Sequence, residues 1–303
     1  MRKIVIIPEF CETHLVRCQI PNLIEVLDPD IIIYNSGLFP SGPEGHTLTS
    51  PAFCNKWCHP DLTNVGFDYD ELLQLEKENP KVRVQRMRYN THDPNINFLK
   101  AISTFPHDFQ PEVGDLIFPL EPDAFFHEDD AQLINRHLEK LNPGDGLQCK
   151  WMDFLETQFY TECINLINPK YRRIAYCFDN AENYQAAMNG FTSQNYPALK
   201  KLESIFVRHY AWFRPGKYKE LRYDLIARKD PQYWKDFDNG LEEIRKIKPW
   251  VRSYDNGEII DTRSVDIPEK VLIRPSRSDG AKYATFVDVP HPKAIRSHPN
   301  FVK

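Results

Sequence analysis

The sequence predicts an α/β fold in which a mostly parallel central sheet is flanked by helices. Two short apolar runs near the N-terminus, residues 3–7 (KIVII) and 30–34 (DIIIY), enclose a helical stretch, and a third run follows at residues 116–120 (LIFPL). Runs that are apolar at nearly every position are typical of strands buried on both faces. A strand, a helix and a second strand within about 35 residues form a βαβ unit whose two strands are parallel.

The helix between the first two strands is expected from about His14 to Leu27. Thr13 can cap its start, and Pro21 is expected to kink or split it, because proline lacks the amide hydrogen that an interior helical residue donates. Residues 35–37 (NSG) should turn the chain sharply after the second strand. The other elements expected before the third apolar run are a loop over residues 39–64, a helix over 68–78, a strand over 82–88 and a helix over 95–104.

The second half of the chain is predicted to continue the sheet. Three acids at residues 128–130 suit the first turn of a helix that ends near residue 141, because they lie at the positive end of the helix dipole. Strands are expected over residues 147–154 and 173–177, and a β-rich run begins at residue 205. We place the domain boundary after residue 228, with residues 229–303 as a C-terminal extension.

Composition narrows the class of protein. The chain has 303 residues and a net charge of −5, so it can bury a large core and has no overall attraction to nucleic acid or membranes. No apolar run reaches the length of a membrane span, and the first ten residues (MRKIVIIPEF) are not expected to form a signal peptide, because the stretch is too short and too quickly acidic. Seven scattered cysteines suggest reduced thiols. These features favour a cytoplasmic protein without a membrane span.

Two acidic residues follow the third apolar run. Glu121 and Asp123 are separated by Pro122, and residues two apart on an extended segment point the same way. Two converging carboxylates can bind one divalent cation, and ligands of open α/β sheets lie at the carboxyl ends of strands. The alternative is that the pair opens a turn and caps the next helix, although residues 128–130 already provide acids there.

The segment LEPDAFFHE resembles the strand-end acidic motif of family 2 glycosyltransferases with the GT-A fold, whose members read LDADEFF. The resemblance implies Mn²⁺ or Mg²⁺ held against the diphosphate of a nucleotide sugar. Glu121 then replaces the first Asp of the motif and Asp123 matches the second. Ala124 is a departure, since relatives often carry Glu at that position.

A second segment, residues 205–222 (IFVRHYAWFRPGKYKELR), resembles the H-Y/F-x-W segment of the same family. The resemblance implies that His209 is a third metal ligand and that Arg214 and Lys217 contact the diphosphate. It also implies that Glu9 and Asn35, at the ends of the first two strands, contact the base and ribose. From the residues alone, a core histidine, a solvated basic helix and ordinary turn residues remain alternatives.

These features together predict a metal-dependent glycosyltransferase that moves a sugar from a nucleotide-diphosphate donor to an acceptor hydroxyl. Such a reaction needs a carboxylate to accept the acceptor proton, and Asp153 and Glu156 are the candidates. The alternatives are a metal-dependent hydrolase of phosphoesters or glycosides and a non-catalytic module that binds nucleotide sugars. The hydrolase needs more ligands, for which Asp179, Glu128 and His127 are available.

The acceptor is predicted to be a saccharide first and a hydroxymethylated DNA base second. Residues 200–252 contain 14 Lys and Arg against 8 Asp and Glu, so this segment is basic in an acidic chain. It is either a solvated helix surface or a seat for an anionic acceptor, and Trp212, Trp234 and Trp250 lie within it. We expect the C-terminal extension to close over the acceptor side. The oligomeric state is unknown.

Overall fold

The computed structural model describes residues 1–38, 50–87, 102–155, 160–162, 171–189, 199–210, 213–226, 239, 253–255, 258–260, 270–274, 282–287 and 289–301. The chain divides into two compact units. The first unit comprises Met1–Lys150 and Tyr171–Phe206, and the second comprises Trp151–Lys170 and Val207–Lys303. Two strands of the main sheet, β6 and β9, cross from the first range to the second, so their last residues are counted with the second unit.

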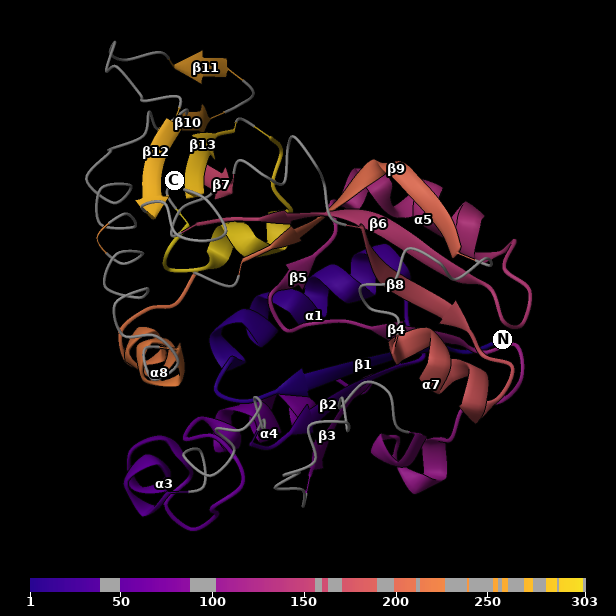
Figure 1. Ribbon diagram of the computed structural model, residues 1–303, viewed down its shortest axis with the longest axis horizontal. Coiled ribbons are helices and arrows are strands. Elements are labelled where there is room, and N and C mark those ends of the chain that lie inside the picture. The colour runs from indigo at the N-terminus through magenta and orange to yellow at the C-terminus, as the bar shows by residue number, and fades with distance from the viewer. Residues whose placement is uncertain are drawn as a thin grey trace. The chain divides into compact units, whose positions relative to one another are not determined.

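The central sheet has eight strands in the order β3-β2-β1-β4-β8-β6-β9-β5 (Figure 1). The pairs β3–β2, β2–β1 and β1–β4 are parallel, whereas β8 is antiparallel to both β4 and β6, so β6 runs in the same direction as β4. The predicted α/β class with a mostly parallel sheet is confirmed. The strands are β1 (Lys3–Glu9), β2 (Ile31–Ser36), β3 (Val82–Arg86), β4 (Leu116–Pro119), β5 (Ala124–Phe125), β6 (Gly146–Asp153), β8 (Tyr171–Cys177) and β9 (Leu199–His209).

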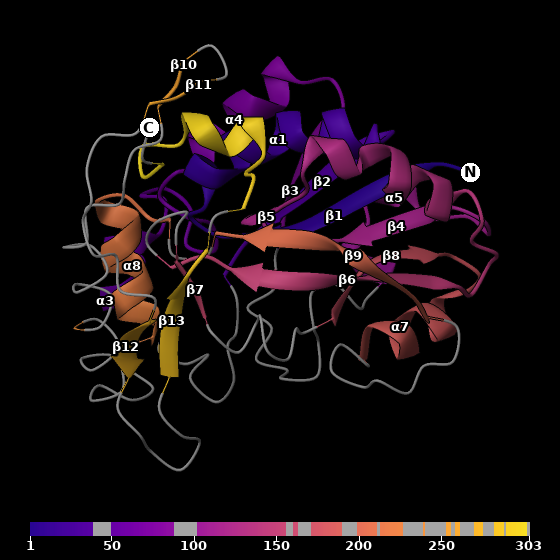
Figure 2. The same cartoon turned by 90° about the horizontal axis from the view of Figure 1, so that it is seen from above.

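Helices cover both faces of this sheet. Figure 2 shows α1 (Thr13–Leu27) and α5 (Ala131–Leu138) on one face and α7 (Ala181–Asn189) on the other. Side chains alternate along a strand, and Ile4 and Ile6 of β1 join one buried cluster with Tyr184 of α7. On the opposite face, the Tyr34 hydroxyl donates to Gln19 of α1. The strands are therefore buried on both sides, as their continuous apolar sequence predicts.

Helix α1 excludes one of the two outcomes predicted at Pro21, a split helix, and the kink stays a prediction. The helix is continuous from Thr13 to Leu27, so Pro21 does not split it. Thr13 is the first helical residue, and the capping position belongs to Glu12. Ten buried residues of α1 attach it to the sheet, and this burial outweighs the loss of one backbone hydrogen bond at the proline.

Other boundaries also change. The predicted loop over residues 39–64 contains a helix, α3 (Pro51–Trp57), whose first turn is capped by the Ser50 hydroxyl. The predicted turn at residues 35–37 begins later, because Asn35 and Ser36 belong to β2. The acids at 128–130 form a 3-10 turn, η4 (Glu128–Asp130), directly before α5. The further elements of the first unit are α4 (Tyr69–Glu78), η2 (Ile102–Thr104) and η3 (His107–Phe109), and residues 88–101 lie outside the described part.

The second unit contains two small sheets. β7 (Tyr160–Glu162), β12 (Lys270–Arg274) and β13 (Lys282–Phe286) form an antiparallel three-stranded sheet, and β10 (Ser253–Asp255) pairs with β11 (Glu258–Ile260). In the described part of this unit, α8 (Lys217–Ile226) and η5 (Lys293–Ser297) are helical. The boundary after residue 228 stays a prediction, because residues 227–238 lie outside the described ranges. Within those ranges, no helix has the length and apolarity that a membrane crossing requires.

Candidate functional site

Glu121 lies at the carboxyl edge of the sheet. It follows the end of β4, and the antiparallel pairing of β4 with β8 brings the start of β8 to the same edge. There Arg172, the second residue of β8, donates from Nη1 to Glu121 Oε1 over 2.6 Å. The Glu121 side chain is 35% exposed and the Arg172 side chain is 26% exposed. The first acid of the pair is therefore already matched by a cation of the chain.

Helix α1 fixes the backbone that carries the two acids. The Gln19 amide donates to the carbonyl oxygens of Glu121 (2.6 Å) and Ala124 (3.0 Å). Asn22, one turn later, donates to the Phe126 carbonyl and accepts from the Phe126 amide. These bonds satisfy backbone groups that burial would otherwise leave unpaired. Sequence reasoning missed Gln19 and Asn22, although two amides on the buried face of an apolar helix are a readable signal.

Asp123 lies between these anchored positions and is 5% exposed. The next two residues, Ala124 and Phe125, form β5, and Phe126 follows it. Both aromatic side chains are fully buried and hold the segment against the core. The alternative prediction, that the acidic pair opens a turn, is correct as far as the turn itself, since the Ala124 amide donates to the Glu121 carbonyl. The following helical turn is capped by His127, whose ring accepts from the Asp129 amide, and not by Glu121 or Asp123.

His209 is the last residue of β9 and is 7% exposed. Its Nδ1 lies 2.5 Å from Asp153 Oδ1, at the end of β6, and the same carboxylate oxygen accepts from Trp151 Nε1 over 3.0 Å. The Phe154 amide also donates to the His209 carbonyl. A carboxylate on Nδ1 fixes the orientation of an imidazole and leaves Nε2 for another partner.

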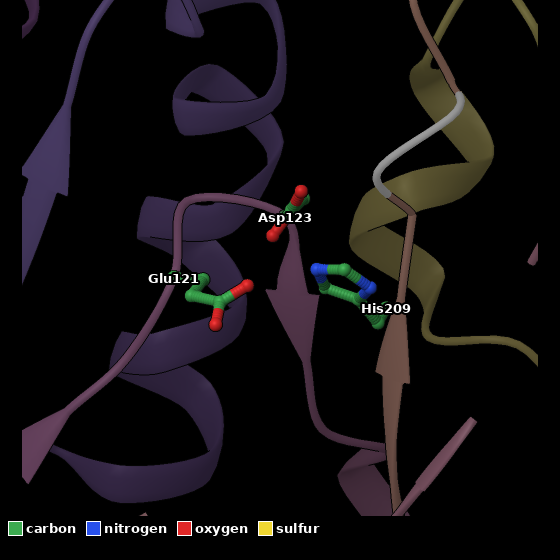
Figure 3. A group of neighbouring side chains, drawn as sticks. All are labelled: Glu121, Asp123 and His209. Carbon is green, nitrogen blue, oxygen red and sulfur yellow. The ribbon is translucent and has the colours of Figure 1, made fainter. Parts of the chain in front are cut away.

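Figure 3 shows Glu121, Asp123 and His209 with a ring nitrogen of the histidine facing Asp123. One ligand atom from each of the three lies within 4.8 Å of the others. This spacing is comparable with twice the metal–ligand distance of about 2.1 Å that Mg²⁺ requires. Two carboxylates and one imidazole are a donor set that fits Mg²⁺ or Mn²⁺. The sequence-predicted metal ligands are thus brought together.

Glu9 and Asn35 occupy the ends of β1 and β2 but point to opposite faces. Glu9 is 1% exposed, accepts from the Glu12 amide (3.0 Å) and from the Ser36 hydroxyl (2.8 Å), and lies on the α1 face. Asn35 is fully buried on the other face, where it donates to the Thr104 carbonyl over 3.1 Å. Both belong to strands, so neither is an ordinary turn residue. Their contacts with base and ribose stay predictions.

Burial makes the Glu9 carboxyl a weaker acid than an exposed glutamate. Its removal from water and the nearby Asp68 carboxylate raise the pKa of Glu9 to about 8, against the opposing effect of its two hydrogen bonds. Asp68 is buried as well, and its pKa is also raised mainly by burial, although it accepts from the Thr13 amide. A protonated Glu9 is therefore the stable form around neutral pH.

The predicted diphosphate contacts have different environments. Arg214 is 5% exposed. Burial of His298, and to a lesser extent the positive charge of Arg214, lower the pKa of His298 to about 4. Lys217 is exposed at the start of α8. Glu156, the second candidate for the general base, lies outside the described residues, as do Trp212, Trp234 and Trp250.

The comparisons with known proteins give one kind of match. No family model and no curated protein matches the sequence. Two solved structures of S. aureus TarS are similar to the chain at 10% identity. The structure of TarS 1-349 matches with a TM-score of 0.39 over 69% of this chain and 60% of that one. The other matches with a TM-score of 0.38 over 76% and 39%. The chain thus spans less than two thirds of either structure, and at these values the likeness does not define a function.

Proposed function

We propose that this protein is a metal-dependent glycosyltransferase that transfers a sugar from a nucleotide-diphosphate donor to an acceptor hydroxyl, with a saccharide as the first choice of acceptor. The observation that carries the proposal is the convergence of Glu121, Asp123 and His209 at the carboxyl edge of an α/β sheet. Ligands of such sheets bind at this edge. The resemblance of the acidic segment to the glycosyltransferase motif supports the same reading.

The three side chains would hold Mn²⁺ or Mg²⁺, which supplies charge neutralisation for the departing diphosphate. Asp123 is the central ligand of the proposal, because it is buried and its segment is anchored by Gln19. Arg214 and Lys217 are proposed to add positive charge near the phosphates. In the transfer, the bond between the anomeric carbon and the diphosphate oxygen breaks, the acceptor oxygen bonds to that carbon, and the acceptor proton passes to a base.

Asp153 suits a positioning role better than the role of base. One of its oxygens accepts from Trp151 and lies against His209, so that oxygen is engaged by two neighbours. We therefore propose that Asp153 orients His209 toward the cation. We propose that Glu156, the other of the two predicted candidates, is the base that accepts the proton of the acceptor hydroxyl.

The hydrolase alternative receives less support from the same residues. Asp179 accepts from the Tyr176 hydroxyl, from the Asn180 amide and from the Asn183 side chain, so it is committed to the start of α7. His127 accepts from the Asp129 amide at the cap of η4. Neither residue joins the group of Glu121, Asp123 and His209 within the described part of the chain.

A thermal-shift screen of nucleotide sugars and nucleoside diphosphates, with and without Mn²⁺, tests the proposal. We expect one nucleoside diphosphate to raise the melting temperature only when Mn²⁺ is present, and Asp123→Asn to abolish this shift. Asp108→Asn is the matched control, since Asp108 is an exposed aspartate paired with Arg83. Stabilisation that persists in Asp123→Asn, or that never depends on Mn²⁺, contradicts the proposal.

The acceptor is tested separately by binding of duplex DNA over a salt series. Phosphate contacts predict affinity that falls steeply with salt, with a log–log slope of about −0.9 for each phosphate neutralised. We expect no such binding for an enzyme with a saccharide acceptor. Tight, salt-sensitive binding would move hydroxymethylated DNA to first place.

A further inference from the structure

Arg172 is a residue to which neither the acidic motif nor the later histidine segment assigns a role. It is the second residue of β8, a strand that the sequence analysis predicted only from residue 173. Its guanidinium contacts Glu121, the first predicted metal ligand, and both side chains belong to the first unit. An Arg–carboxylate hydrogen bond of 2.6 Å between charged groups is among the stronger polar contacts of a protein.

This ion pair opposes binding of a cation on its own. A cation held by Glu121 and Asp123 must lie a few ångströms from the guanidinium, and like charges at that distance repel each other even where water screens them partly. The bond to Nη1 also engages Oε1, one of the two oxygens that Glu121 offers to a metal. Binding of the metal alone therefore either breaks the pair or accepts the repulsion.

An anionic donor removes this conflict. Arginine binds phosphate oxygens with the same planar geometry that it uses for carboxylates. A diphosphate that shares the cation with Glu121 and Asp123 brings negative charge to the edge where Arg172 lies. The guanidinium can then exchange Glu121 for a phosphate oxygen, and the carboxylate becomes fully available to the cation.

We propose that Arg172 couples binding of the cation to binding of the diphosphate donor, by holding Glu121 until the donor arrives. The proposal rests on the proposed function of the site and names a residue that regulates its assembly. Because coupling between two ligands is reciprocal, the cation must tighten donor binding by the same factor as the donor tightens cation binding. Arg172 would then prevent the site from filling with metal when no donor is present.

The test measures free Mn²⁺ by electron paramagnetic resonance, alone and with ADP, CDP, GDP or UDP, for the wild type and Arg172→Gln. For the wild type we expect weak binding of Mn²⁺ alone and at least tenfold tighter binding with the preferred diphosphate. Arg172→Gln should bind Mn²⁺ alone roughly tenfold more tightly, because the competing charge is gone. In this variant, the diphosphate should increase the affinity for Mn²⁺ by less than about threefold.

Two variants control the experiment. Arg17→Gln removes another arginine from a 2.6 Å ion pair, with Glu71, and should behave as the wild type. Arg172→Lys keeps the positive charge but lacks the planar guanidinium. Binding of Mn²⁺ alone should therefore remain weak, while the increase in Mn²⁺ affinity caused by the diphosphate becomes smaller. The lysine variant also serves if the glutamine variant does not fold.

The possible failures are distinguishable. Unchanged Mn²⁺ affinity and unchanged gain in both Arg172 variants would overturn the inference and leave the proposed function standing. Loss of Mn²⁺ binding in Arg172→Gln would also overturn it, since Arg172 would then support the ligands and not compete for them. A wild type that binds no Mn²⁺ under any of these conditions would overturn the proposed function and the inference together.

Discussion

Replacing Glu9 by glutamine should stabilise the protein at high pH and not at low pH. The Glu9 carboxyl is fully buried beside Asp68, and these two causes raise its pKa from 4.5 to about 8. In the unfolded chain the same group ionises near its ordinary value. A raised pKa in the folded state means that the contribution of Glu9 to stability is fully present below about pH 4.5 and is lost as the pH rises toward 8.

The size of the effect follows from the linkage between proton binding and folding. Stability falls by about 1.4 kcal/mol for each pH unit over which the unfolded chain is ionised and the folded one is not. Between pH 5 and pH 8 the wild type should therefore lose roughly 3 kcal/mol through this group. Glutamine keeps the acceptor oxygen for the Glu12 amide but carries no charge, so Glu9→Gln should not show this loss.

The assay is urea unfolding of both proteins at pH 5, 6.5 and 8, followed by tryptophan fluorescence. The difference in unfolding free energy between Glu9→Gln and the wild type should grow with pH. Glu25→Gln, an exposed glutamate of α1, is the control and should give a constant difference. If the difference for Glu9→Gln does not change between pH 5 and pH 8, the carboxyl is already ionised in the folded protein and the reasoning is refuted.

Three further outcomes follow from the packing and charges. Gly66→Ala should lose about 1–3 kcal/mol in urea unfolding, because its Cβ would lie 2.4 Å from Cys11 Sγ and 2.9 Å from the Cys11 amide; an unchanged midpoint would contradict this. Burial and Arg214 lower the pKa of His298 to about 4, so stability should fall as the pH drops from 6.5 toward 4, and His298→Gln should reduce that fall in thermal melts. Asp153→Asn should weaken Mn²⁺ binding by about 10–100-fold when free Mn²⁺ is measured by electron paramagnetic resonance. An affinity equal to that of the wild type would exclude the positioning role of Asp153.

The parts of the fold that depend on local sequence were predictable. The continuous apolar runs of β1, β2 and β4 determine that these strands are buried on both faces, and the helix between the first two completes the parallel pair. The predicted splitting at Pro21 was wrong, since the rule that proline breaks helices is local, whereas the burial of α1 against the sheet is a property of the whole unit.

The site was predictable only in part, for the same reason. Glu121 and Asp123 could be singled out as candidate ligands because ligands bind at strand ends and the acidic spacing is visible in the sequence. Arg172 could not be found, because its bond to Glu121 joins residues 51 positions apart and depends on the antiparallel register of β4 and β8. The pairing of His209 with Asp153, 56 positions away, depends in the same way on how β6 and β9 end together.

The central claim is that Asp123 and its neighbours hold a cation for sugar transfer. Its most direct test incubates the protein with a panel of nucleotide sugars and oligosaccharide acceptors in Mn²⁺, and measures glycosylated product by mass spectrometry. We expect product from one donor with the wild type and with Asp108→Asn, and none with Asp123→Asn or after chelation of the metal. Product formed at the wild-type rate by Asp123→Asn, or in the presence of chelator, would contradict the claim.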